Sequence, residues 1–154
     1  MTIRAITAAL SPLARRLYYT PIPTPDATRL ITQTLADTLS ELGHDVTLEP
    51  RTPGGRLDLL SVGPDGRALA VEIDRADKQW SVRKLARCAE EFWTDALWIR
   101  WRGRVRIEVP ETVCLIDMCT PRTRIRHAHA LCTQQPPARH AQTHGRRDRD
   151  PSHA

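Results

Sequence analysis

The chain has 154 residues, 40% apolar and 27% charged, which is the profile of a globular protein of one domain. No apolar run approaches the ~18 residues of a membrane-spanning helix, and the run at 5–10 is shorter than a signal-peptide core of ~7 to 15 residues. These features exclude the usual signals for insertion or export. We therefore expect a cytoplasmic protein with no membrane partner.

The net charge of +5 is unevenly distributed. Residues 120–154 contain seven arginines against Asp148 and Asp150, whereas residues 26–119 sum to −3. The 120–154 segment has no Val, Phe or Trp, and so little apolar surface cannot offset the entropy of ordering it. We expect the folded part to end near Cys119 and a basic, disordered tail to follow. Such a tail suits contacts with phosphates, but it is equally compatible with no specific role.

Hydrophobic spacing predicts the elements in chain order. Residues 1–25 form an N-terminal arm, with a short helix that Pro12 bends or ends and a proline-rich linker. A helix is expected from Asp26, its N-cap, to Leu42. This order predicts an α/β domain with a central mixed sheet, in which 96–99 is the apolar central strand. Further along, we expect strands at 45–49, 56–62 and 67–74, a helix at 81–93, and strands at 96–101, 105–109 and 113–118.

Two acidic residues, Asp58 and Glu72, fall on adjacent predicted strands joined by the turn 63–66. A three-residue hairpin loop with a glycine bulge makes the numbers of each cross-strand pair sum to 130, so that Asp58 lies opposite Glu72. Partners of this kind have Cβ atoms about 4.5 to 5.5 Å apart on one face. A four-residue loop would instead put the two acids on opposite faces.

Two carboxylates this close either raise one pKa or bind a cation, and an oxygen-only ligand set suits Mg²⁺. Acids that simply face solvent from a half-exposed sheet are the alternative. The lysines favour a reactive site, because only Lys78 and Lys84 among 23 basic residues are lysines and both follow Glu72 closely. Lysine can lose its solvation and orient or deprotonate water, whereas arginine stays charged. A chance grouping of two lysines would look the same.

The sequence Gly-Gly-Arg-Leu-Asp at 54–58, a glycine turn, Ala-Val-Glu-Ile-Asp at 70–74 and a lysine-bearing helix together resemble the PD-(D/E)XK nuclease superfamily. The resemblance covers about residues 26–118. It implies a restriction-endonuclease-like core of order helix-strand-strand-strand-helix-strand, with one or two extra strands, over a nuclease-like domain at 26–119. It also implies a Mg²⁺-dependent endonuclease, with Mn²⁺ as a substitute, that hydrolyses phosphodiester bonds of DNA rather than RNA.

Within this resemblance, Asp58 and Glu72 correspond to the side chains that hold Mg²⁺, and the Ile73 backbone carbonyl to a further ligand. The sequence departs from the superfamily pattern where Leu57 replaces proline and where Asp74 replaces the usual lysine. Some members carry an acid at the latter position, and Asp74 then adds to the catalytic group or to a second metal ion.

Other members place the lysine on the following helix, where Lys84 lies, and Lys78 is the nearer candidate in the preceding loop. Either amine would steady the attacking water. Glu41 corresponds weakly to a helical glutamate that ligates metal in many members, and an ordinary solvent-facing glutamate is the alternative.

Nucleic-acid contacts are expected from basic and aromatic side chains beside the acids, although solvation explains the arginines equally well. The four cysteines have no metal-site spacing and are expected to be buried or incidental thiols. A catalytically inactive binding module for nucleic acid or protein is the main rival, a cysteine-ligated metal protein is a weaker one, and a homodimer stays open. The predicted nucleic-acid contacts are Arg75, Arg83, Arg87 and Trp80.

Overall fold

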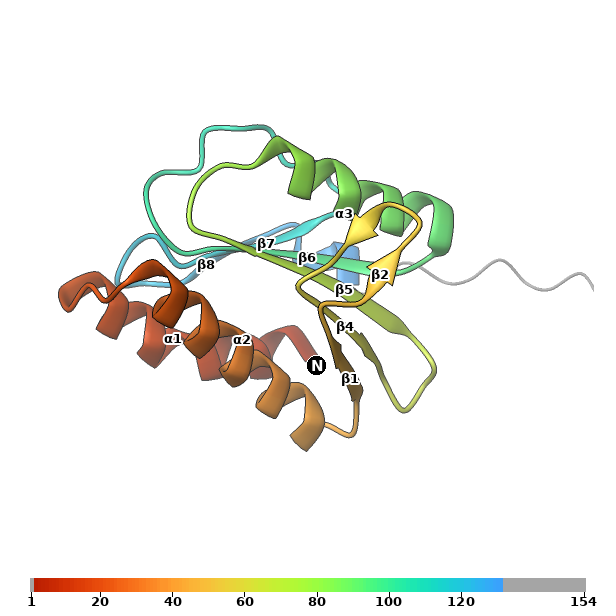
Figure 1. The fold of residues 1–154 in the computed structure, drawn as a ribbon, viewed down its shortest axis with the longest axis horizontal. Helices are drawn as coiled ribbons and strands as arrows, with labels where there is room; N and C mark the ends of the chain where they lie inside the picture. The colour runs from red at the N-terminus through yellow and green to blue at the C-terminus, as the bar shows by residue number, and fades with distance from the viewer. Residues whose placement is uncertain (1, 132–154) are drawn as a thin grey trace, which may run out of the picture.

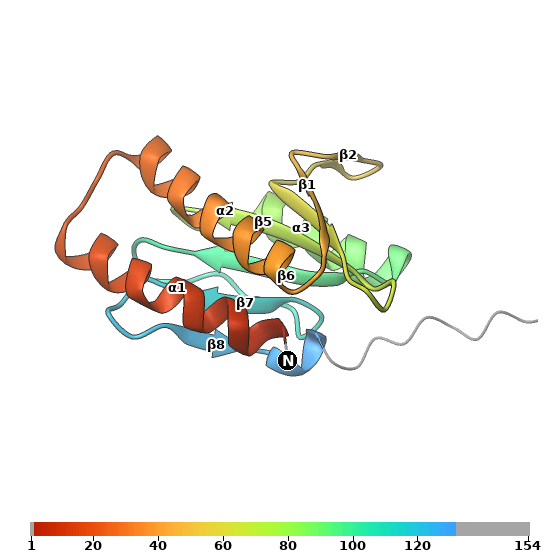
Figure 2. The ribbon, with the colours of Figure 1, turned by 90° about the horizontal axis from the view of Figure 1, so that it is seen from below.

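The computed structural model describes residues 2–131 and has an α/β architecture. A six-stranded mixed sheet of order β1-β4-β5-β6-β7-β8 lies between α1 and α2 on one face and α3 on the other (Figures 1 and 2). The predicted class and mixed sheet are confirmed. The helices are α1 (Thr2–Tyr19), α2 (Thr24–Glu41), α3 (Gln79–Phe92) and the 3₁₀ helix η1 (Ala128–Leu131). The strands are β1 (Asp45–Leu48), β2 (Arg51–Thr52), β3 (Gly55–Arg56), β4 (Leu59–Val62), β5 (Ala68–Asp74), β6 (Asp95–Arg100), β7 (Cys114–Asp117) and β8 (Arg124–Arg126).

The N-terminal segment forms the expected helix, but this helix packs in the core of the domain instead of forming an arm. α1 runs through Pro12, and Ile6, Leu10 and Ala14 are fully buried in the core shared with α2 and the sheet. A proline inside a helix costs ~3 kcal/mol, but burial of the apolar stripe on α1 outweighs that cost.

No helix in the described part of the chain is long and apolar enough to cross a membrane.

Two helix starts also differ from the prediction. α2 begins at Thr24 with Pro23 as its N-cap, so Asp26 lies in the first turn and does not cap the helix. α3 begins at Gln79 and not beyond Ser81, because Lys78 takes the extended N-cap conformation. As a result Ser81 lies inside the helix and is fully buried.

The C-terminal part of the fold extends beyond Cys119, contrary to expectation. β8 pairs antiparallel with β7, and η1 buries Ala130 to 3% exposure in the core. The segment 105–109 is not a strand, since Val105 and Val109 pack beneath α3 without a pairing partner. The rest of the predicted tail, including Cys132, lies outside the described residues.

The β4–β5 hairpin has the predicted register. Leu59 pairs with Val71 and Val62 with Ala68, so each pair sums to 130. The Gly63 amide donates to the Arg67 carbonyl at 2.8 Å and closes the loop. β5, β6 and β7 run parallel, so their carboxyl ends share one edge of the sheet, and β6 is the buried central strand.

Replacing Gly66 with alanine should destabilise the fold by about 1–2 kcal/mol, because Gly66 has φ +79° and an L-residue is strained there. A Cβ atom at this position meets no neighbour within 4 Å, so the loss would come from the backbone alone. Urea unfolding measures it. An unchanged midpoint would show that the turn relaxes at no cost.

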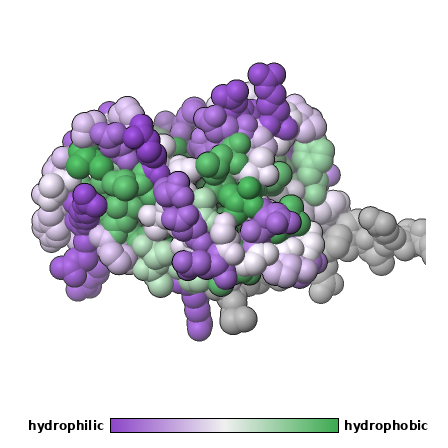
Figure 3. Space-filling view, turned by 60° about the horizontal axis from the view of Figure 1, so that its bottom comes forward, coloured by the Kyte–Doolittle hydropathy of each residue, from purple (hydrophilic) through white to green (hydrophobic). Residues whose placement is uncertain are grey.

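Side chains of alternate residues of β5 point to opposite faces of the sheet. Leu69, Val71 and Ile73 join the core beneath α1 and α2, whereas Ala70 joins the core beneath α3. Figure 3 shows the α1–α2 side, where apolar surface appears in separate areas between polar side chains. Glu72 and Asp74 lie two and four residues after Ala70, so their side chains point to the same face and lie under α3.

Candidate functional site

Three acidic residues, Asp58, Glu72 and Asp74, lie near the carboxyl end of β5. Asp58 lies one residue before β4, and its Oδ2 accepts a 2.6 Å hydrogen bond from the Ile73 amide. The Asp58 carboxylate therefore accepts a hydrogen bond from a backbone amide of β5, and this bond holds it beside Glu72. The Asp58 and Asp74 carboxylates are close enough to Glu72 to act on its pKa.

Glu72 is 2% exposed and has two partners from α3. The Lys84 Nζ atom lies 2.5 Å from Glu72 Oε1, and the Ser81 hydroxyl donates to Oε2 at 3.3 Å. Lys84 is itself buried and also donates to the Arg56 carbonyl. Lys84 thus supplies the positive charge that compensates Glu72. Removing one partner of such a pair leaves a buried charge without compensation.

Burial raises the pKa of Glu72 to about 7, because the effect of burial and of the nearby Asp58 and Asp74 carboxylates outweighs that of Lys84. Burial also raises the pKa of Asp58, with Asp74 adding to the shift, although the Ile73 amide opposes it. A second cation would relieve this repulsion between acids.

The raised pKa of Glu72 predicts that the free energy of unfolding falls as pH increases from about 4.5 to about 7. In this range the folded protein keeps a proton that the unfolded chain releases, so the stabilisation is present at low pH and lost above the folded pKa. Urea unfolding of the wild type and Glu72→Gln across this range measures the difference. Parallel pH profiles for the two proteins would contradict the prediction.

Asp74 is held by two side chains. Its Oδ2 accepts a 2.9 Å hydrogen bond from Trp98 Nε1, and Lys78 Nζ lies 3.6 Å from Oδ1. Trp98 is fully buried on β6, whereas the Lys78 side chain is 57% exposed at the start of α3. Each lysine therefore pairs with a different acid, Lys84 with Glu72 and Lys78 with Asp74.

A buried arginine fixes the loop that precedes α3. Arg100 is 1% exposed, and its Nε and Nη2 atoms each lie 3.0 Å from Asp77 Oδ1. Its Nη1 atom donates to the carbonyls of Arg75 and Arg102 at 2.5 and 2.7 Å. Burial alone would raise the pKa of Asp77, but hydrogen bonds from the Arg106 amide and from Arg100 lower it.

Sequence reasoning missed Ser81, Trp98, Arg100 and Asp77. The only indication in the sequence is the alternation along β6. Trp98 and Arg100 lie two and four residues after Ala96, so they point to the same face of the sheet as Ala96, beneath α3. Ser81 stands at the start of the predicted helix 81–93, but in the structure it lies inside α3 and its hydroxyl donates to Glu72.

The predicted nucleic-acid contacts are exposed, and one predicted metal ligand is not at the site. Trp80 is 62% exposed, and Arg75 and Arg83 are also exposed. Arg87 is exposed and pairs with Glu91 at 2.8 Å. The structure does not bring Glu41 to the acids, since it lies exposed at the end of α2, on the opposite face of the sheet. The prediction of Glu41 as a metal ligand fails for that reason.

The oxygen donors at the site fit Mg²⁺ better than a metal that needs a full protein cage. Among residues 2–131, no group of three or more His, Cys, Asp or Glu side chains could hold an ion. Mg²⁺ is commonly held by one or two carboxylates while it keeps several waters. Asp58 and Glu72, with the Ile73 carbonyl as the predicted third donor, match that requirement. Cys88 and Cys114 are buried as expected.

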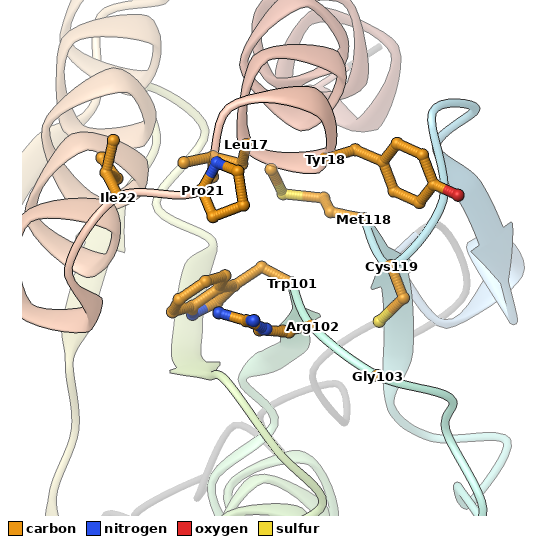
Figure 4. A pocket seen from close by; sticks show the side chains of 9 residues that line it. All are labelled: Leu17, Tyr18, Pro21, Ile22, Trp101, Arg102, Gly103, Met118 and Cys119. Carbon is orange, nitrogen blue, oxygen red and sulfur yellow. The ribbon is translucent and has the colours of Figure 1, made fainter.

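Two cavities lie away from the acids. One of about 200 Å³ lies between the end of α1 and the end of β6, where Leu17, Pro21 and Met118 face the Trp101 ring (Figure 4). The other, of about 650 Å³, lies beside the β4–β5 turn and includes Pro64. Neither cavity is lined by Asp58 or Glu72.

Comparisons with protein-family models, curated proteins and solved structures return no significant match. The functional interpretation therefore depends on the geometry of Asp58, Glu72 and Lys84.

Proposed function

We propose that this chain is a Mg²⁺-dependent nuclease that hydrolyses phosphodiester bonds, with DNA as substrate in preference to RNA. The observation that carries the proposal is that the Asp58 carboxylate, held by the Ile73 amide, lies close enough to Glu72 to act on its pKa, while the Lys84 amine is 2.5 Å from Glu72. The element order α2-β1-β4-β5-α3-β6 supports a restriction-endonuclease-like core, because it repeats the order that the sequence resemblance implies. The preference for DNA comes from that resemblance.

Each side chain has a distinct role in this proposal. Asp58 and Glu72 would hold Mg²⁺ or Mn²⁺, and the ion would supply a water molecule of lowered pKa and positive charge against the phosphate. Asp58 is already oriented by the Ile73 amide and offers its second oxygen as a ligand. Glu72 supplies the other carboxylate once the Lys84 amine no longer compensates it. The Lys84 amine is then available to orient the attacking water, and the exposed Lys78 amine beside Asp74 is the alternative for that role.

A catalytically inactive binding module is the second candidate, and the observation that favours it is charge compensation within the site. Lys84 pairs with Glu72, and Asp74, which stands where the superfamily carries lysine, is held by Lys78 and Trp98. In such a protein the acids would stabilise the fold and the exposed basic residues on α3 would bind nucleic acid.

A plasmid-nicking assay separates the two candidates. The wild type should nick DNA with Mg²⁺ or Mn²⁺ and not with EDTA, and Asp58→Ala should be inactive. Asp65→Ala is the matched control, because Asp65 is an exposed acid at the opposite end of the same hairpin. Unchanged DNA at every metal concentration, together with DNA binding, would support the binding module instead.

A further inference from the structure

The β2–β3 hairpin leaves the main sheet between β1 and β4 and lies beside α3 (Figure 1). Its base is closed by two backbone hydrogen bonds of 3.0 Å, from the Leu57 amide to the Pro50 carbonyl and from the Glu49 amide to the Asp58 carbonyl. The hairpin therefore ends two residues before Asp58 in the chain.

The hairpin pairs two like charges. Arg51 lies directly opposite Arg56 in the β2–β3 register, so the two side chains leave the same face, and both residues are exposed. Like charges placed opposite each other on a strand pair are destabilising. Arg56 has a distant partner in Glu49, at 3.8 Å with both side chains largely exposed, and Arg51 has no ion pair among residues 2–131. No acidic side chain among residues 2–131 pairs with both guanidinium groups.

The hairpin is also connected to the candidate site. A Cβ atom on Gly54 would lie 3.7 Å from Lys84 Cγ and 4.0 Å from Arg87 Cδ, so the hairpin tip rests on these two side chains of α3. Lys84 then links the hairpin to the acids, because its amine contacts both the Arg56 carbonyl and Glu72.

We propose that the β2–β3 hairpin is a phosphate clamp, in which Arg51 and Arg56 bind one backbone phosphate of the nucleic acid. This proposal rests on the proposed function for its ligand. The planar guanidinium groups suit two-pronged contacts with phosphate oxygens. Such contacts position the nucleic acid without reading its sequence. With the clamp occupied, the adjoining stretch of backbone would run toward Asp58, which follows Arg56 by two residues.

Fluorescence anisotropy with a labelled double-stranded oligonucleotide in EDTA tests the clamp while cleavage is prevented. Arg51→Gln and Arg56→Gln should each weaken binding, and the slope of log affinity against log salt should become shallower by about 0.9 for each lost phosphate contact. Arg29→Gln is the control. It makes the same charge change on a 77% exposed side chain of α2, on the opposite face of the sheet, and should leave the slope unchanged.

The outcomes separate the clamp from the nuclease. An unchanged slope in both hairpin variants, an equal loss in Arg29→Gln, or a wild type that does not bind the oligonucleotide would overturn the clamp. Wild-type binding that depends on Arg51 and Arg56, without cleavage in Mg²⁺, would support the clamp and contradict the nuclease. Thermal unfolding of each variant confirms that its fold is intact.

Discussion

Replacing Glu72 with glutamine should lower the rate of Mg²⁺-dependent DNA cleavage by about 10³-fold or more, because a bound metal contributes several kcal/mol of transition-state stabilisation. Glutamine keeps the shape of the side chain and an oxygen for the Ser81 hydroxyl, which donates to Glu72 in the wild type. The lost negative charge is therefore the main change. The measurement is the initial rate of plasmid nicking at saturating Mg²⁺.

Two further measurements sharpen this result. Titration calorimetry with Mg²⁺ should show weaker binding by Glu72→Gln than by the wild type, which distinguishes loss of the metal from loss of DNA. Asp65→Asn makes the same chemical change at an exposed position of the β4–β5 turn and should cleave at the wild-type rate. Nicking by Glu72→Gln at the wild-type rate would exclude Glu72 as a metal ligand.

Replacing Leu10 with alanine should destabilise the protein by about 3–5 kcal/mol, the range for a fully buried leucine that leaves a cavity. Leu10 is 0% exposed and packs in the core formed by α1, α2 and the sheet. Since a domain of this size is stable by only about 5–15 kcal/mol, the loss is a large part of the total. Urea unfolding monitored by tryptophan fluorescence measures it.

Leu48→Ala is the matched control, because Leu48 lies on the edge strand β1 and is 50% exposed. The same chemical change there should cost less than about 1 kcal/mol. If Leu10→Ala cost no more than Leu48→Ala, α1 would contribute little to the core and residues 1–25 would behave as the arm that the proline spacing indicated.

The closeness of Asp58 to Glu72 could be expected from the sequence, because it depends on a local feature. The loop at 63–66 limits the hairpin to a few geometries, and the three-residue form sets every cross-strand pair. The side of α3 on which Lys84 lies could also be predicted, because the spacing of Val82, Leu85 and Cys88 indicates which side of the helix faces the sheet.

The partners of these residues depend on elements far apart in the chain. Trp98 reaches Asp74 only because β6 is parallel to β5 in one particular register, in which Glu72 pairs with Trp98. Ser81 reaches Glu72 because α3 begins earlier than its sequence indicates. Local propensity does not specify either contact.

The sequence by itself determined the α/β class and limited the β4–β5 hairpin to a few registers, one of which puts Asp58 beside Glu72, because alternation and turn chemistry act over a few residues. Tertiary structure alone decided that α1 is part of the core, that β8 completes the sheet, and that Lys84 compensates Glu72 while Lys78 approaches Asp74. Such contacts form when burial of apolar surface brings distant segments together, and burial also raises the pKa of Glu72.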